Sequence, residues 1–312
     1  MPCYRSRAYV LEVLERVGEN VSHILVVDDA CPEQTGQYVA EHCQDPRIEV
    51  IFHPQNSGVG GATISGFLRA LELGAQYIVK LDSDGQMDPR HIDKLVRPLQ
   101  DGVADYSKGN RFYDLDYLKP MPLIRLIGNA GLSFMSKFSS GYWDLMDPTN
   151  GFIAIHRSVL ELLPLDKIDR RYFFESDLLF RLNIVRAVVR DVPMASIYQD
   201  ARSNLSVAES LFRFFGLHLV RGCKRIFYNY FLRDFNIGSI NLLLGSVLMG
   251  WGLTEGMSTY LTNNALGQAT PTGTIMIVML EIIMGFQMLL SFINYDTSHI
   301  PSSALQQTLA ER

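Results

Sequence analysis

The chain has 312 residues, a formal net charge of −5 and a hydrophobic fraction of 47%. This length is sufficient for a complete α/β domain with further segments. The acidic balance disfavours a nucleic-acid-binding surface, which would be basic. The four cysteines have no C-x-x-C spacing, so they indicate neither a zinc site nor a disulfide scaffold, and free thiols are typical of a reducing compartment.

The first 81 residues alternate between helical and strand patterns. Apolar residues recur at helical spacing in three segments, 8–17, 35–43 and 63–73. Short apolar runs rich in β-branched residues predict three strands, 23–27, 48–52 and 77–81. This alternation predicts an α/β fold with a largely parallel sheet and helices on both faces.

Polar or glycine-rich residues follow each of these strands. Asp28 and Asp29 follow the first, the run NSGVGGA (56–62) follows the second, and Asp82-Ser83-Asp84 follows the third. Open α/β sheets bind ligands at the carboxyl ends of their strands. Two carboxylates one residue apart can share a divalent cation, which can in turn hold a diphosphate. The alternatives are helix caps and solvated turns for the aspartates, and a helix-entry turn for the glycine run.

These motifs together resemble family 2 glycosyltransferases. VVDDAC, NSGVGGATISG and KLDSDGQMDP occur in the order and spacing of that family. The resemblance implies a GT-A catalytic domain, which is Rossmann-like and binds a nucleotide sugar. The opening PCYR resembles the end of the family's first strand and its following turn, which predicts that most of this strand is missing.

The resemblance also implies which residues bind the donor. Asp84 is the expected ligand of Mg²⁺ or Mn²⁺, and Asp82 is expected to bridge toward the ribose or the metal. The full set implied for the nucleotide sugar is Pro2, Tyr4, Asp28, Asp29, Asn56, Gly60, Asp82, Ser83 and Asp84.

Three later segments resemble the acceptor side of the polyprenyl-phosphate branch: DYSKGNRF, DPTNGFIAIHRSVL and FFESDLLFRLN. They imply inverting transfer of a sugar to a lipid phosphate. Candidates for a general base are Asp147, Glu175 and Asp177, although an ionised phosphate acceptor hardly needs one. The alternative for Glu175 is a cap on a helix that begins near Ser176. Arg111 and Arg202 are candidates for the acceptor phosphate, since a guanidinium binds phosphate bidentately, or else form ordinary surface ion pairs.

Residues 211–235 mix aromatic with basic side chains. On a helical wheel Arg213, Arg221, Lys224 and Arg225 fall on one stripe. A helix of this kind suits a bilayer interface, although an amphipathic helix packed on the α/β domain fits as well.

Residues 237–256 and 274–293 are apolar and long enough to span a bilayer. The loop 257–273 between them has no lysine or arginine, so the positive-inside rule predicts two spans with the catalytic domain in the cytoplasm, most simply at a bacterial inner membrane. The alternative is a helical hairpin buried in a soluble core. Glu281 in the second span is expected to contact the lipid acceptor, a neighbouring subunit of a homo-oligomer, or the hairpin itself.

The expected organisation is therefore a GT-A domain over 1–205, interfacial helices over 206–236, and a transmembrane hairpin with a short tail over 237–312. The expected function is transfer of a sugar from a UDP- or GDP-sugar to a polyprenyl phosphate. Two alternatives stay open: transfer to another membrane acceptor, such as a glycolipid or glycan, and a catalytically silent scaffold that binds a nucleotide sugar. A processive synthase is disfavoured, because no Q-x-x-R-W motif follows the acidic segment.

Overall fold

The computed structural model describes residues 1–113, 123–148, 150–194 and 207–310. The chain forms two compact units. The α/β unit comprises Met1–Cys223 together with Pro301–Arg312, and the hairpin unit comprises Lys224–Ile300. The boundary expected near residue 205 lies outside the described residues.

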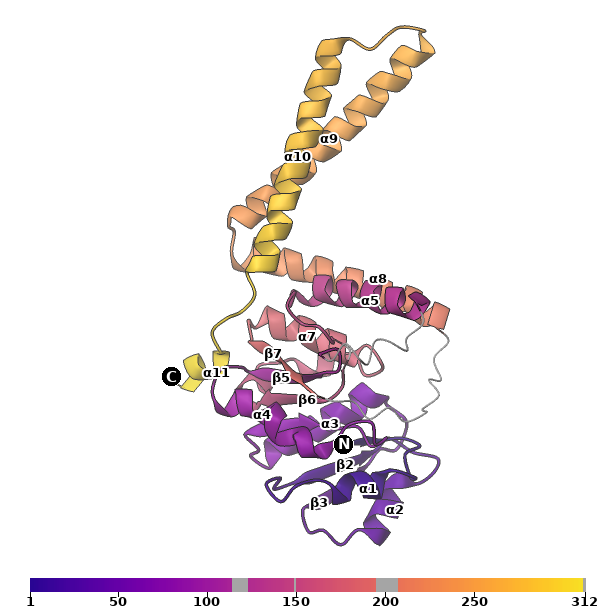
Figure 1. The fold of residues 1–312 in the computed structure, drawn as a ribbon, viewed down its shortest axis with the longest axis vertical. Helices are drawn as coiled ribbons and strands as arrows, with labels where there is room; N and C mark the ends of the chain where they lie inside the picture. The colour runs from indigo at the N-terminus through magenta and orange to yellow at the C-terminus, as the bar shows by residue number, and fades with distance from the viewer. Residues whose placement is uncertain (114–122, 149, 195–206, 311–312) are drawn as a thin grey trace. The chain divides into compact units, whose positions relative to one another are not determined.

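The described strands of the α/β unit form two sheets (Figure 1). The first has the order β1-β2-β3 and is parallel, with β1 (Pro2–Cys3), β2 (Ile24–Asp28) and β3 (Ile48–Phe52). The second has the order β4-β6-β5-β7, with β4 (Tyr77–Lys80), β5 (Tyr106–Asn110), β6 (Ile153–His156) and β7 (Val189–Pro193). Only β6 runs antiparallel to its neighbours, which confirms a mostly parallel arrangement. The first strand is present as two residues paired with Val27 and Asp28.

Helices pack against these sheets. The longest segments near the strands are α3 (Val59–Glu72), α4 (Ile92–Gln100) and α7 (Phe174–Ile184). In α4 the buried residues Ile92, Leu95, Val96 and Leu99 recur at helical spacing and form one apolar stripe. The remaining short helices of the unit are α1 (Val10–Glu15), α2 (Thr35–His42), η1 (Pro89–His91), α6 (Arg157–Leu160), η3 (Leu165–Lys167) and α11 (Leu305–Ala310).

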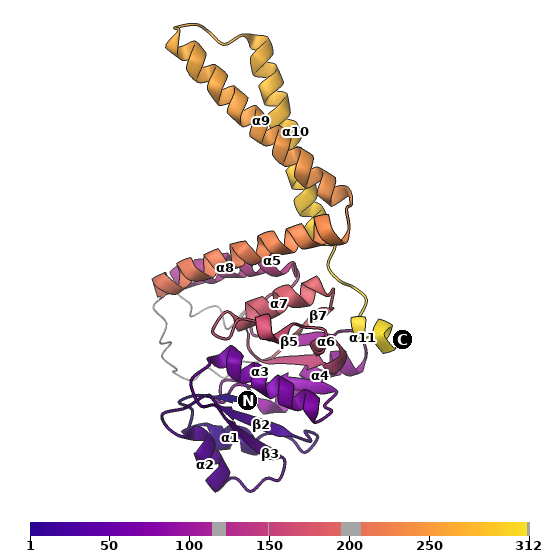
Figure 2. The same ribbon diagram turned by 180° about the vertical axis from the view of Figure 1, so that it is seen from behind.

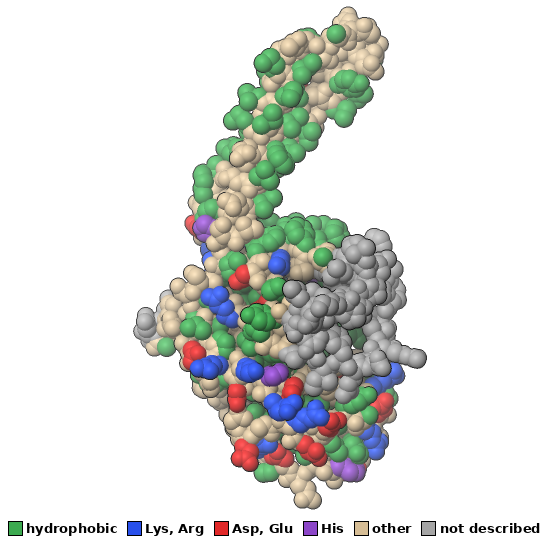
Figure 3. Space-filling model, in the orientation of Figure 1, with side chains coloured by type: hydrophobic (Ala, Val, Ile, Leu, Met, Phe, Trp, Pro, Cys, Tyr) green, Lys and Arg blue, Asp and Glu red, His purple; other side chains and the backbone are tan. Residues whose placement is uncertain are grey.

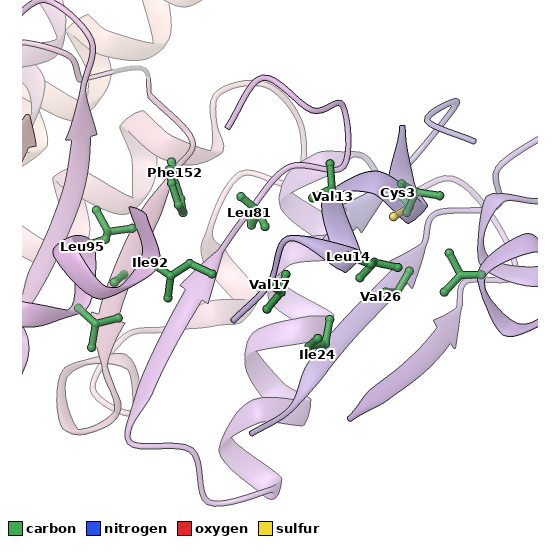
Figure 4. Packing of buried hydrophobic residues seen from close by; sticks show 14 of the residues in the cluster. Cys3, Val13, Leu14, Val17, Ile24, Val26, Leu81, Ile92, Leu95 and Phe152 are labelled. Carbon is green, nitrogen blue, oxygen red and sulfur yellow. The ribbon is translucent and has the colours of Figure 1, made fainter. Parts of the chain in front are cut away.

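One hydrophobic core connects the two sheets (Figure 4). Cys3 of β1 and Val26 of β2 belong to the same cluster as Leu81 after β4, Leu95 of α4 and Phe152 before β6. The ends of β1, β2 and β4 are therefore positioned by shared side-chain packing as well as by backbone pairing.

Two long helices lie side by side at the edge of the α/β unit (Figures 1 and 2): α5 (Leu123–Ser140) and α8 (Val207–Phe227). A Cβ at Gly222 would collide with the ring of Phe138, so glycine permits this close approach. The buried His218 Nδ1 lies 2.8 Å from Ser139 Oγ, and burial lowers the pKa of His218 to about 4. A neutral imidazole therefore joins the two helices at neutral pH.

The hairpin unit contains the π-helical turn Tyr228–Arg233, α9 (Ile237–Ala265) and α10 (Thr272–Ser298). Both predicted apolar segments lie within longer helices. The predicted loop over 257–273 is wrong in its first half, because residues 257–265 continue α9. The chain turns only at Gly267, whose φ of 64° suits glycine, and at Pro271, which precedes α10.

Gly245 and Gly285 allow α9 and α10 to approach each other. A Cβ at Gly245 would lie 3.0 Å from the backbone of the opposite helix, and one at Gly285 would lie 2.6 Å from it.

The surfaces of α9 and α10 are apolar and exposed. In the most apolar stretch of each helix only 22% and 11% of residues are buried. Figure 3 shows hydrophobic side chains along this hairpin. Helices of a soluble core would bury such residues, so that alternative is wrong for the described chain, and both helices are candidate membrane spans by length and composition.

An ion pair connects the two ends of the hairpin unit. Arg225 is 2% exposed and binds Asp296 bidentately at 2.7 and 2.9 Å, and the Tyr230 hydroxyl donates to the same carboxylate at 2.7 Å. The helical wheel predicted that Arg225 belongs to an exposed cationic stripe. This prediction is wrong, because Arg225 is buried in an internal ion pair.

The segment after α10 returns to the α/β unit. The buried Asp105 carboxylate accepts hydrogen bonds from Leu305 N and Gln306 N, both at 2.8 Å, and from Val188 N at 2.7 Å. Asp105 thereby caps α11 and connects it to the start of β7.

Candidate active site

The loop after β4 is attached to the end of β1. The Ser83 hydroxyl lies 3.0 Å from the Pro2 carbonyl oxygen and 2.7 Å from Ser6 Oγ. Asp84 Oδ1 accepts a hydrogen bond from Gln86 N at 3.0 Å, and Gly85 provides the left-handed turn with a φ of 77°. Pro2 and Ser83 thus have structural contacts that fix the two aspartates at the strand end.

Lys80, the last residue of β4, is the centre of a buried charge cluster. Its Nζ lies 2.8 Å from Asp82 Oδ1 and 3.2 Å from Glu175 Oε1, and it donates to the Gly151 carbonyl at 3.2 Å. Burial alone would lower the pKa of Lys80, but the two carboxylates outweigh it and raise the pKa above its ordinary value. Lys80 is therefore a fixed cation that joins the aspartate loop to α7.

Gly151 is where these three side chains converge. A Cβ at this position would lie 2.5 Å from Lys80 Nζ, 3.0 Å from Asp82 Oδ2 and 3.3 Å from Glu175 Oε1. Only glycine leaves room for the cluster, which explains the glycine in the acceptor-like segment TNGF.

The aspartate pair has spare capacity for a cation. Asp82 Oδ2 and Asp84 Oδ2 accept no hydrogen bond from any described residue. Burial and the neighbouring charge of Asp82 raise the pKa of Asp84, although the Gln86 amide opposes this. The described residues contain no group of three or more His, Cys, Asp or Glu that could hold a metal. The two carboxylates fit Mg²⁺ or Mn²⁺ only as part of a shell that substrate and water complete.

Asp28 and Asp29 bind backbone amides. Asp28 accepts from Cys31 N at 2.7 Å and from Gly36 N at 2.6 Å, which caps α2. Asp29 accepts from Ser57 N and Gly58 N, both at 2.8 Å, and lies 2.8 Å from His53 Nδ1. These contacts correspond to the capping and turn roles that the sequence also allowed.

The glycine run packs against protein backbone. Gly61 N donates to the Arg170 carbonyl at 2.9 Å, and a Cβ at Gly60 would lie 2.5 Å from the Asp169 carbonyl oxygen. Gly58 has a φ of 86°, and a Cβ there would lie 2.5 Å from the Arg170 carbonyl oxygen. Asn56 Nδ2 reaches the Asp29 carbonyl at 3.2 Å. The segment 56–61 is thus a helix-entry turn held between Asp29 and the loop 169–171.

The three candidate bases have different ion-pair partners. Asp147 is fully buried and binds Arg111 at 2.7 and 3.0 Å, and Asp177 is fully buried with Arg181 and Arg221. Glu175 alone lies beside the aspartate loop, through Lys80. It does not cap a helix at Ser176, because α7 already begins at Phe174.

Tyr4 and Arg202 are the remaining candidates from the sequence. Tyr4 is 46% exposed, with the Arg5 guanidinium 5.5 Å from its ring centroid. Arg202 lies outside the described residues.

Lys80, Gly151 and Lys108 were missed from the sequence. Lys108 is fully buried, and its Nζ has no hydrogen-bond partner in the described structure. Burial lowers the pKa of Lys108 to about 8, although Asp147, Asp191 and Glu175 oppose this shift. A lysine inside the otherwise buried strand β5 was the available signal, since such a residue is rarely buried without a partner.

Comparisons with known proteins identify the family. Residues 1–163 match the profile described as Glycosyl transferase family 2. The UDP-N-acetylglucosamine–dolichyl-phosphate N-acetylglucosaminyltransferase of Methanococcus voltae is 30% identical over 214 residues, which is 64% of this chain and 85% of the relative. The polyprenol monophosphomannose synthase of Mycolicibacterium smegmatis is 29% identical, over 68% of this chain and 83% of the relative.

A solved structure has a similar fold. Glucosyl-3-phosphoglycerate synthase from Mycobacterium tuberculosis, in complex with Mn²⁺, uridine-diphosphate and phosphoglyceric acid, superposes with a TM-score of 0.53 at 15% identity. The match covers 72% of this chain and 76% of that one. At this identity it supports the GT-A-like fold of the α/β unit and nothing further.

Proposed function

The chain belongs to glycosyl transferase family 2, and from that premise we propose that it moves a sugar from a UDP- or GDP-sugar to a polyprenyl phosphate. The observation that carries the proposal is the Asp82–Lys80–Glu175 cluster at the end of β4, in a chain that also has two candidate membrane spans. The names of the two relatives supply the acceptor class. An oxygen of the lipid phosphate attacks the anomeric carbon, the bond from that carbon to the diphosphate breaks, and the nucleoside diphosphate leaves.

The donor side of this reaction belongs to the aspartate loop. Asp84 and Asp82 would hold Mg²⁺ or Mn²⁺, which supplies charge neutralisation for the departing diphosphate. Lys80 keeps the Asp82 side chain directed, because its ammonium binds one oxygen of that carboxylate and leaves the other available. Ser83 keeps the loop against Pro2.

The acceptor side falls to Glu175 and the residues near it. Lys80 holds Glu175 beside the donor loop, so this carboxylate can orient an acceptor or accept a proton. A phosphate acceptor is already ionised, so orientation is the role we assign. Arg111 is 35% exposed beside buried Asp147 and is the described arginine we assign to the acceptor phosphate.

The membrane arrangement follows from the same proposal. The hairpin α9–α10 spans the bilayer twice, and the absence of lysine and arginine from residues 257–273 directs the turn between the two helices, residues 266–271, away from the cytoplasm. The α/β unit then works at the cytoplasmic face, where nucleotide sugars are present.

Membranes that contain the protein provide the test. They are incubated with radiolabelled UDP- and GDP-sugars and Mg²⁺ or Mn²⁺, and label is followed into organic solvent. We expect a lipid-soluble product that mild acid cleaves, and its loss in Asp84→Ala. The matched control is Asp101→Ala, an exposed aspartate after α4, which should retain full activity.

Three results would count against this function. No lipid product with any donor contradicts it outright. A product that survives mild acid indicates a glycolipid or glycan acceptor. Equal losses in the Asp84 and Asp101 variants would remove the connection to the metal loop.

A further inference from the structure

We infer that Arg221 of α8 is a positioning residue for donor binding, although it lies on a helix outside the α/β core. It acts through Asp177 and the loop 169–171 on the helix-entry turn 56–61. We call this the donor-side turn, because it contains Asn56 and Gly60, which the family resemblance implies for the nucleotide sugar. The inference rests on the proposed function only in so far as the turn belongs to a nucleotide-sugar site.

The first link is a buried ion pair. Arg221 Nε lies 2.5 Å from Asp177 Oδ1, and the Asp177 side chain is fully buried. Arg181 binds the other oxygen of this carboxylate at 3.2 Å. Asp177 therefore depends on two guanidinium groups, and only Arg221 comes from outside α7.

The second link runs from Asp177 to the loop before α7. Asp177 Oδ2 accepts a hydrogen bond from Asp169 N at 2.9 Å. On the far side of the same loop, the Phe173 ring lies 4.8 Å from the ring of His218, also on α8. The loop is thus attached to α8 at both of its ends.

The third link connects this loop to the donor-side turn. Arg170 O accepts from Gly61 N at 2.9 Å, and the Cβ positions of Gly58 and Gly60 are occupied by backbone of residues 169 and 170. The turn has no space to move independently of that loop. Asp29 holds its opposite side through Ser57 N and Gly58 N.

Arg221 differs from Arg213, a second arginine of α8. Arg213 is exposed, whereas the Arg221 side chain is 18% exposed and turned toward Asp177. The predicted cationic stripe is therefore divided, and Arg213→Gln is a matched control for Arg221→Gln: the same charge is lost from the same helix.

The kinetic experiment compares these variants in the full-length membrane protein. We expect Arg221→Gln to raise the KM for the nucleotide sugar by about fivefold or more, a typical coupling between linked sites, with a smaller change in kcat. Arg221→Lys should recover part of the loss, and Arg213→Gln should leave both constants unchanged. A fall in kcat at constant donor KM, or equal effects of the two glutamine variants, would overturn the inference.

A second measurement does not require a known donor. In hydrogen exchange, the amides of Asp169 and Gly61 should lose protection in Arg221→Gln and keep it in Arg213→Gln. The double variant Asp177→Asn/Arg221→Gln removes both charges of the Arg221–Asp177 pair and should show the same loss. Unchanged protection in Arg221→Gln or in the double variant overturns the inference. If protection changes as expected but the enzyme uses no nucleotide-sugar donor, the proposed function is refuted and the structural link from Arg221 to the turn stands.

Discussion

At the scale of single residues, the site depends on one position that has no side chain. Gly151 faces Lys80, Asp82 and Glu175 at distances that exclude a methyl group. We expect Gly151→Ala to lower activity by about 100-fold, because small misplacements of catalytic groups have effects of that size. Initial rates with saturating substrates would measure this.

The control for this substitution is another glycine with open space. At Gly131 of α5, an added methyl carbon would have no heavy atom within 4 Å. Gly131→Ala should retain activity and stabilise the helix by up to about 1 kcal/mol. Similar activity of both alanine variants would show that the cluster does not need its present geometry.

Lys108 gives a stability prediction with a defined pH window. Burial lowers its pKa from 10.5 to about 8, so the unfolded chain binds more protons between these values. Stability should therefore rise with pH from about 8 to 10.5, by up to about 3 kcal/mol from this group alone. Below pH 8 the cost of burying the charged lysine is constant.

The measurement is the unfolding midpoint in detergent as a function of pH. Lys108→Met should be more stable than the natural protein at pH 7 and should lack the extra rise above pH 8. Lys94→Met, which removes an exposed lysine of α4, should follow the natural profile. Parallel profiles for the natural protein and Lys108→Met would refute the assignment.

Residue spacing could identify Asp82 and Asp84 but not their surroundings. A D-x-D pair after an apolar run is a local pattern, and the loop that carries it is where the sequence placed it. Lys80 and Glu175 are brought together by the pairing of β4 with β6 and by the position of α7, which no local pattern contains. The sequence likewise could not choose among Asp147, Glu175 and Asp177, because their partners come from distant segments.

At the scale of elements, residue periodicity predicted the positions of single helices and strands. It could not predict which side chains are buried by contacts with other segments. The strand over 48–52 was predicted with its observed ends. The wheel of α8 placed Arg213, Arg221, Lys224 and Arg225 on one stripe. It could not show that two of them bind buried carboxylates, Asp177 and Asp296.

The Arg225–Asp296 pair should dominate the stability of the hairpin unit. Asp296→Asn leaves a buried guanidinium without its countercharge and should lower the free energy of unfolding by about 3 to 5 kcal/mol. Ser291 lies on α10, as Asp296 does, and its hydroxyl accepts an exposed hydrogen bond from Asn241 of α9. Ser291→Ala removes this bond and should change the free energy of unfolding by less than about 0.5 kcal/mol. Thermal unfolding in detergent would compare them, and equal midpoints would contradict a structural role for the pair.

At the scale of the whole molecule, the position of the tail limits the proposed membrane topology. Residues 301–310 belong to the α/β unit, where Asp105 caps α11 and Gln306 Nε2 donates to the Leu99 carbonyl at 3.0 Å. A tail docked on the α/β unit must lie on the same side of the membrane as that unit. An even number of crossings lies between them, which agrees with α9 and α10 as two spans.

Single cysteines in sealed vesicles test this topology. In a background that lacks the native Cys43 and Cys223, a membrane-impermeant maleimide should label Tyr113→Cys of the α/β unit and Ser302→Cys of the tail from the same side. Gln268→Cys, between α9 and α10, should react only from the opposite side. Labelling of all three from one side would mean that the hairpin lies on the membrane without crossing it. Labelling of Ser302→Cys opposite to Tyr113→Cys would mean that the tail is not docked as observed, because no segment can contact Asp105 from across a bilayer.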